Sequence, residues 1–108
     1  MSIELDKHVE IADLLSYYES LLTPKQLLIM RYYYLDNYSL SEIAELENVS
    51  RNAIFDQLKR TVKKLYNFED NLKLKEKAHL RQTLINKLKN TKDQTLINQL
   101  LEALEKVE

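Results

Sequence analysis

Apolar residues recur three and four positions apart through most of the chain, which is the spacing of amphipathic helices. The first such segment covers about residues 3–22, and Glu10, Asp13 and Glu19 fall off its apolar stripe. We therefore predict a helix there that buries one face. The stripe is formed by Ile11, Leu14, Leu15, Tyr18, Leu21 and Leu22.

Two further helices have strong start signals. Thr23 precedes Pro24 and has Gln26 three residues later, while Ser39 has Glu42 three residues later. Both patterns are capping boxes, in which two side chains bond each other's backbone amides, and proline suits the first helical position. These signals predict one helix that begins at residue 24 and a second, short one that begins at residue 40. The first is expected to end at the turn-forming pair Asp36 and Asn37.

Residues 39–65 have the features of a helix-turn-helix motif. Asn48 falls where the corner needs left-handed backbone, a conformation that asparagine tolerates better than most residues do. Val49 is expected to plug the corner into the core, and Ser50 to cap the second helix. Ala44 is small where the two helices would cross. The buried faces are predicted to include Ile43 and Leu46 on the first helix and Ala53, Ile54 and Leu58 on the second.

The pattern after the motif leaves one choice open. The apolar face continues through Val62 and Leu65, loosens at residues 67–71 and then resumes. This predicts either one long bent helix or two helices joined near Asn67. Residues 90–93 form a predicted turn before a last helix. The corresponding domain prediction is a helix-turn-helix domain at 1–66 and a C-terminal helical extension at 67–108.

Composition supports an all-α fold and argues against several classes of function. The 108 residues include no glycine, no cysteine and one proline, which argues against hairpins, phosphate-binding glycine loops, disulfides and cysteine-based zinc sites. His8 and His79 are isolated, and the acidic residues are scattered, so we expect no metal site, no cofactor and no enzymatic activity. The acidic start and the short apolar runs predict a cytoplasmic protein without a signal peptide or membrane span.

The charge distribution says more than the net charge of −1. Residues 1–50 carry three basic and nine acidic side chains, whereas residues 51–92 carry twelve basic and four acidic ones. The remaining residues, 93–108, have a net charge of −3. This acidic, basic, acidic order indicates a local anionic partner, such as nucleic acid.

The second helix of the motif carries the candidate site. In this class of motif its first turns enter the major groove, and later basic residues reach phosphates. Asn52 has the chemistry to read adenine, and Arg51 to read guanine or hold a phosphate. Phe55 is expected to be buried against the C-terminal helices, or else to contact a thymine methyl. The predicted nucleic-acid-binding residues are Arg51, Asn52, Asp56, Lys59, Arg60, Lys63 and Lys64.

Several of these features also have simpler interpretations. A basic helix face is often only a solvated face, and many helix-turn-helix units serve as packing modules. The seven tyrosines favour core packing over a platform for single-stranded nucleic acid. Leucines near the C-terminus either pack back on the long helix or form the seam of a homodimer. Those leucines are Leu96, Leu100, Leu101 and Leu104.

Three stretches of the sequence resemble the YlxM-type family of small bacterial helix-turn-helix proteins. They are LLTPKQ at 21–26, YYLDNYSLSEIAE at 33–45 and VSRNAIFD at 49–56, and the resemblance covers roughly residues 11–90. The same core is similar to region 4 of sigma-70-type factors, which reads the −35 promoter element. The chain departs from the usual motif at Asn48, where glycine is more common.

The resemblance implies both a fold and a role. The fold would be a sigma-70 region 4-like helix-turn-helix, of the winged-helix-like DNA-binding class, with a C-terminal helical extension. The role would be that of a DNA-binding regulatory protein. Genes of this family usually lie beside the gene of the signal-recognition-particle GTPase, which implies a part in that pathway. The alternative is a modulator that binds the particle's RNA or GTPase without sequence-specific DNA binding.

Overall fold

The computed structural model describes residues 7–108, and that part of the chain is entirely helical. It contains six α-helices, one 3₁₀ turn and no strand, which confirms the predicted all-α fold. The chain divides into two compact units, an N-terminal unit at Met1–Asn71 and a C-terminal unit at Leu72–Glu108. This boundary lies a few residues after position 66, where the first domain was predicted to end.

The first described helix, α2 (His8–Tyr18), is shorter than the predicted segment 3–22. Residues 3–6 of that segment lie outside the described residues. After Tyr18 the chain tightens into the 3₁₀ turn η1 (Glu19–Leu21). The tighter winding takes Leu21 off the apolar stripe, and its side chain is 47% exposed, so its predicted burial is wrong.

Helix α3 (Pro24–Tyr34) begins at the predicted capping box. The hydroxyl of Thr23 accepts a hydrogen bond from the backbone amide of Gln26 (3.2 Å), and the Gln26 side chain accepts one from the Thr23 amide (3.0 Å). The helix ends before Asn37, which has a left-handed backbone with φ 59°. The predicted start and the predicted break are therefore both confirmed.

The long helix α5 (Arg51–Leu72) continues beyond the position where the sequence placed a joint. Its break from α6 (Leu74–Lys89) lies at Lys73, whose backbone is left-handed with φ 55°. Residues 67–71 stay helical because they pack on α2: the Phe68 ring lies 5.7 Å from the Tyr18 ring, and the Tyr18 hydroxyl donates to Glu69 (2.5 Å). The chain thus forms two helices, but their joint is not at Asn67.

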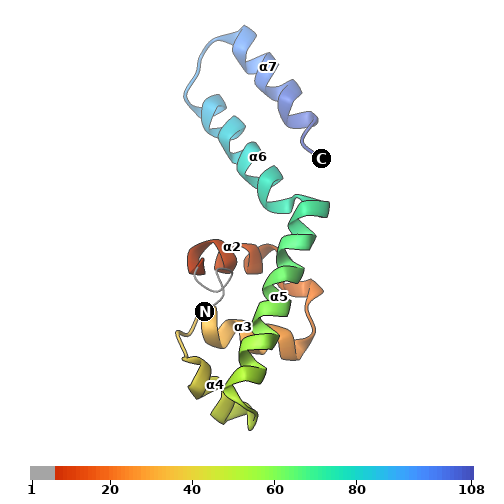
Figure 1. Cartoon of the computed structure of the whole chain (residues 1–108). Coiled ribbons are helices and arrows are strands. Elements are labelled where there is room, and N and C mark those ends of the chain that lie inside the picture. The colour runs from red at the N-terminus through yellow and green to blue at the C-terminus, as the bar shows by residue number, and fades with distance from the viewer. Residues whose placement is uncertain (1–6) are drawn as a thin grey trace. The chain divides into compact units, whose positions relative to one another are not determined.

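The core of the N-terminal unit lies between one face of α5 and the helices beside it (Figure 1). Four side chains of α5 have no exposed surface, and they meet buried side chains from α2, α3 and α4 (Leu40–Glu47). The tyrosines pack into or against this core, as predicted, and Tyr18, Tyr33 and Tyr34 are buried. The fully buried residues of α5 are Ile54, Leu58, Val62 and Leu65.

The C-terminal unit is a pair of packed helices, α6 and α7 (Gln94–Glu105), joined by the predicted turn at residues 90–93. Asp93 caps α7 by accepting a hydrogen bond from the backbone amide of Thr95 (3.0 Å). The core of this unit is small. Its buried side chains are Leu84, Leu100 and Val107.

Candidate nucleic-acid interface

Helix α4 is the first helix of the motif, and its start is fixed by the predicted capping box. The backbone amide of Ser39 donates to the Glu42 carboxylate (2.9 Å), and the Ser39 hydroxyl accepts from the Glu42 amide (3.0 Å). The Ser39 amide, and then its hydroxyl, lower the pKa of Glu42. Ile43 is buried as predicted, and the small Ala44 is buried as well. Leu46 is 57% exposed because it lies on the outer face of this short helix, so its predicted burial is wrong.

Asn48 makes the corner between the two helices. Its backbone is left-handed (φ 55°, ψ 45°), as the sequence predicted for this position. The amide of Asn48 bonds the Glu45 carbonyl (3.3 Å), and the Val49 amide bonds the Ala44 carbonyl (3.0 Å), the pattern of a Schellman motif. These backbone bonds close the corner without an apolar plug. Val49 is 42% exposed, so the prediction that it enters the core is wrong.

The second helix, α5, starts at a serine cap. The Ser50 hydroxyl accepts a hydrogen bond from the Ala53 amide (3.1 Å), which confirms the predicted cap. Ile54 and Leu58 then enter the core, and Ala53 is half-buried. Because the inward face is fixed by this packing, the opposite face of the first three turns is directed outward.

The predicted site residues lie along that outward face, with one exception. Lys64 is half-buried, and its ammonium lies 6.0 Å from the centre of the Phe68 ring, so its aliphatic chain covers part of the core's rim. The other predicted residues are exposed. They are Arg51, Asn52, Asp56, Lys59, Arg60 and Lys63.

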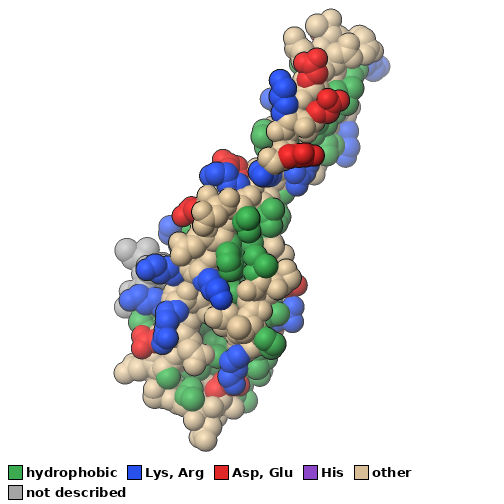
Figure 2. All heavy atoms as spheres, turned by 90° about the vertical axis from the view of Figure 1, so that its right-hand side faces the viewer, with side chains coloured by type: hydrophobic (Ala, Val, Ile, Leu, Met, Phe, Trp, Pro, Cys, Tyr) green, Lys and Arg blue, Asp and Glu red, His purple; other side chains and the backbone are tan. Residues whose placement is uncertain are grey.

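We call the exposed cations Arg51, Lys59, Arg60 and Lys63 the basic edge. None of the four is in an ion pair within residues 7–108, although other surface cations, such as Lys25 with Glu47 and Arg31 with Glu19, do find acidic partners. Lys59 and Lys63 are also one helical turn apart, a like-charge spacing that costs roughly 0.2–0.5 kcal/mol in an isolated helix. Figure 2 shows several Lys and Arg side chains on the visible face of the N-terminal unit.

A hollow of about 220 Å³ lies at the start of α5. It is lined by Arg51, Asn52 and Phe55 of α5 and by Leu40, the first residue of α4. Phe55 is half-buried, and the structure places its ring against the core of the N-terminal unit, where the sequence expected the C-terminal helices. The hollow thus combines two apolar side chains with one amide and one guanidinium.

A second hollow contains Lys25, a basic residue that was not among the predicted site residues. Its volume is about 270 Å³, and it brings the start of α3 beside the middle of α5. Lys25 and Arg60 both line it, so Lys25 lies near the basic edge, with its ammonium paired to Glu47. Lys25 lies in the largely acidic first half of the sequence, and only the fold brings it to α5. The capping box at residue 23 was the one local signal that α3 starts there.

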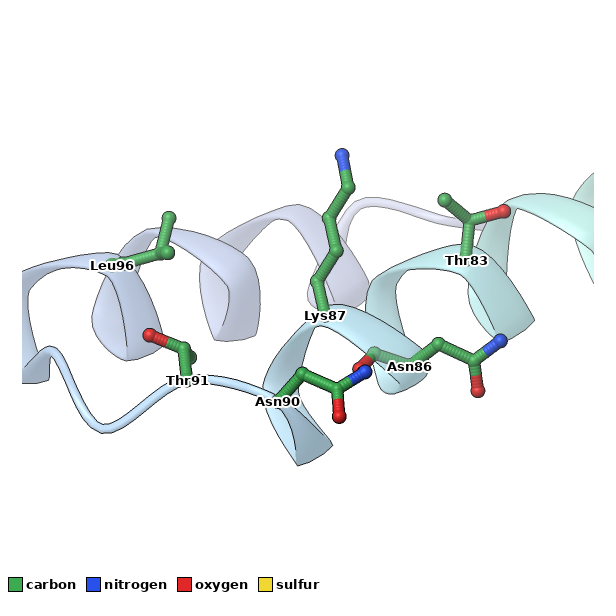
Figure 3. Close-up of a pocket in the computed structure, with 6 residues that line it drawn as sticks. All are labelled: Thr83, Asn86, Lys87, Asn90, Thr91 and Leu96. Atoms are coloured by element: carbon green, nitrogen blue, oxygen red, sulfur yellow. The ribbon is translucent and has the colours of Figure 1, made fainter.

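Outside the motif, a larger hollow of about 470 Å³ lies in the C-terminal unit (Figure 3). Lys87, Asn90 and Thr91 line it together with Leu96, and none of the described residues that line it is an acid that could act as a general base. Within residues 7–108, no cluster of three or more potential metal-ligating side chains is present. No helix in that part of the chain has the length and apolarity to cross a membrane.

Comparison with known proteins places this arrangement in a family. Residues 5–106 match a family model described as "Putative helix-turn-helix protein, YlxM / p13 like". The chain belongs to this family. The YlxM protein of Bacillus subtilis (strain 168) is 43% identical to it, over 98% of this chain and 100% of the relative.

Other members of the YlxM / p13-like family agree in length and identity. A relative from Oceanobacillus iheyensis is 48% identical over 79% of this chain and 81% of its own length. One from an Exiguobacterium species is 44% identical over 96% of this chain and 98% of its own length. The similarity therefore covers the C-terminal unit as well as the helix-turn-helix motif.

Proposed function

We propose that this protein is a DNA-binding regulator that places the first turns of α5 in the major groove of double-stranded DNA. The observation that carries this proposal is the basic edge, whose four cations are exposed and have no ion-pair partner within residues 7–108. Releasing the counterions of DNA phosphates is the main source of affinity for such a surface. Membership of a family described as helix-turn-helix supports the same conclusion.

The position of each residue along α5 determines whether it would contact bases or phosphates. Arg51 and Asn52 lie in the first turn and would face base edges, while Lys59, Arg60 and Lys63 lie two to three turns later and would contact phosphates. We propose this division of roles by analogy with sigma-70 region 4-like readers, which the sequence resembles. A protein in this role acts in the bacterial cytoplasm, where the chromosome is.

Double-stranded DNA fits this geometry better than double-stranded RNA does. The B-form major groove is about 12 Å wide and admits an α-helix, whereas the A-form major groove is too deep and narrow for side chains to read. Because α5 is packed on its inner face, it presents its basic edge as a rigid helix. A rigid helix needs a groove that is already open.

Single substitutions on α5 test this proposal by changing two different properties of binding. With a duplex selected from a random library, we expect Arg60→Ala to weaken binding to all sequences and to reduce the slope of log K against log salt by about 0.9. We expect Asn52→Ala to relax the preference at one base position instead. Lys106→Ala, which removes an exposed cation from the other unit, is the matched control. A salt slope near zero for the unaltered protein contradicts the proposal.

The C-terminal unit suggests that two copies act together. Its core holds three buried side chains, and a unit of this size ordinarily needs a disulfide, a metal or a partner to be stable. Leu80, Leu96 and Leu101 leave apolar surface uncovered, between 38% and 48% of each side chain. We propose that a second copy covers this surface, so that a homodimer presents two α5 helices to a two-fold symmetric site.

The second candidate function is binding to signal-recognition-particle RNA or its GTPase. The observation that favours it is that exposed lysines continue beyond the helix-turn-helix motif, at Lys73 just before α6 and at Lys87 and Lys89 in its last turn. Co-purification with the particle's RNA or GTPase tests it. Charge reversal at Lys73, Lys75 and Lys77 should abolish that co-purification, whereas Arg60→Ala should not.

A further inference from the structure

We propose that the hollow at the start of α5 reads thymine, with the exposed part of the Phe55 ring contacting the thymine methyl group and Asn52 bonding an adenine. This inference rests on the proposed DNA binding and names the kind of sequence bound, a site that contains an A·T pair under the first turns of α5. It assigns specificity to Phe55, which lies beside the basic edge and carries no charge.

The apolar part of the hollow is held in place from behind. Leu40 is 5% exposed and belongs to the core, and the Phe55 ring packs against the same core with part of its surface left open. An aromatic ring fixed in this way loses little further side-chain entropy when it contacts a ligand. The hollow is therefore a preformed apolar surface and not a mobile side chain that must first be ordered.

The polar part lies next to it on the same face of the helix. Asn52 is three residues before Phe55, and Arg51 is four residues before it, so all three side chains share one face of α5. All three line the hollow. No side chain of residues 7–108 bonds the Asn52 amide, whose donor and acceptor atoms are free for a ligand.

Only one base offers an apolar group in the major groove. Thymine carries the C5-methyl there, whereas adenine shows an acceptor and a donor that suit the paired bonds of an asparagine amide. An apolar surface beside a free amide therefore matches the edge of an A·T pair better than that of a G·C pair. RNA lacks this methyl group because uracil replaces thymine, so the hollow also favours DNA.

Removing single methyl groups from the DNA tests the proposal with the unaltered protein. The full-length chain is used to select a duplex from a random library, and each thymine is then replaced by deoxyuridine, one position at a time. We expect one or two positions at which the replacement weakens binding by about three- to fivefold, the effect of losing one buried methyl contact. Equal binding at every position overturns the inference but leaves the proposed DNA binding intact.

A pair of variants assigns the effect to the hollow. Phe55→Ala should bind the thymine and deoxyuridine duplexes equally, whereas Lys59→Ala should weaken both while keeping their ratio. Phe55→Leu keeps an apolar side chain at the core and should retain part of the discrimination, which covers the case in which the alanine variant does not fold. Full discrimination in a folded Phe55→Ala overturns the assignment. If no duplex is selected at all, both the inference and the proposed function fail.

Discussion

At the scale of single residues, the corner of the motif depends on Asn48. Left-handed backbone costs an ordinary side chain roughly 1–2 kcal/mol, because its Cβ approaches the following carbonyl oxygen. Asparagine reduces that cost, and glycine avoids it. The position of α5 relative to α4 follows from this one conformation and the two backbone bonds beside it.

The effect of substituting Asn48 on the free energy of unfolding should therefore depend on the backbone preference of the new residue and not on the size of its side chain. We expect Asn48→Ala to lower the free energy of unfolding by about 1 kcal/mol, and Asn48→Gly to change it by less than about 0.5 kcal/mol. Urea denaturation followed by circular dichroism measures both. Asn67→Ala, at an exposed position inside α5, is the matched control and should be close to neutral. Equal losses for the alanine and glycine variants of Asn48 contradict this account of the corner.

At the scale of elements, the starts of helices and the corner of the motif were predictable because their sequence signals are local. The capping boxes at Thr23 and Ser39, the left-handed Asn48 and the cap at Ser50 each involve residues at most four apart in sequence. The buried stripe of α5 was predictable from periodicity for the same reason. The positions of most candidate site residues, on the opposite face, followed from that stripe.

The features that the sequence could not place depend on distant contacts. Helix α5 extends to Leu72 because Tyr18 holds Phe68 and Glu69, and a separation of about fifty residues leaves no local signal. The burial of Val49 was predicted wrongly because backbone hydrogen bonds close the corner, and side-chain types do not indicate such bonds. Lys25 reaches the neighbourhood of Arg60 only through the packing of α3 on the motif.

At the scale of the whole molecule, the two units have different proposed tasks. The N-terminal unit presents the basic edge, and the C-terminal unit would hold a second copy. Acidic residues of α7 and the residues after it, such as Glu102, Glu105 and Glu108, are available to meet the lysines of α6 from another chain. Dimerisation would double the number of phosphate contacts and restrict binding to paired half-sites.

A charged substitution in the proposed dimer interface of the C-terminal unit should separate the two copies. We expect the unaltered chain to sediment at twice its mass of 12.9 kDa and Leu101→Glu to sediment as a monomer, because a buried carboxylate opposes association. Gln99→Glu adds the same charge at an exposed polar position of α7 and should remain dimeric. The monomer should bind DNA more weakly while keeping its sequence preference. A monomeric unaltered chain, at all concentrations tested, contradicts the proposed seam.

Mapping the residues that DNA contacts tests the proposed position of α5 in the major groove. Titration of the isotope-labelled full-length chain with its selected duplex, followed by backbone amide NMR, reports every residue in one measurement. We expect the largest chemical-shift changes at residues 50–63 and a weaker group at the start of α3. Changes confined to residues 72–108, or no changes at low salt, would contradict the proposed position of α5.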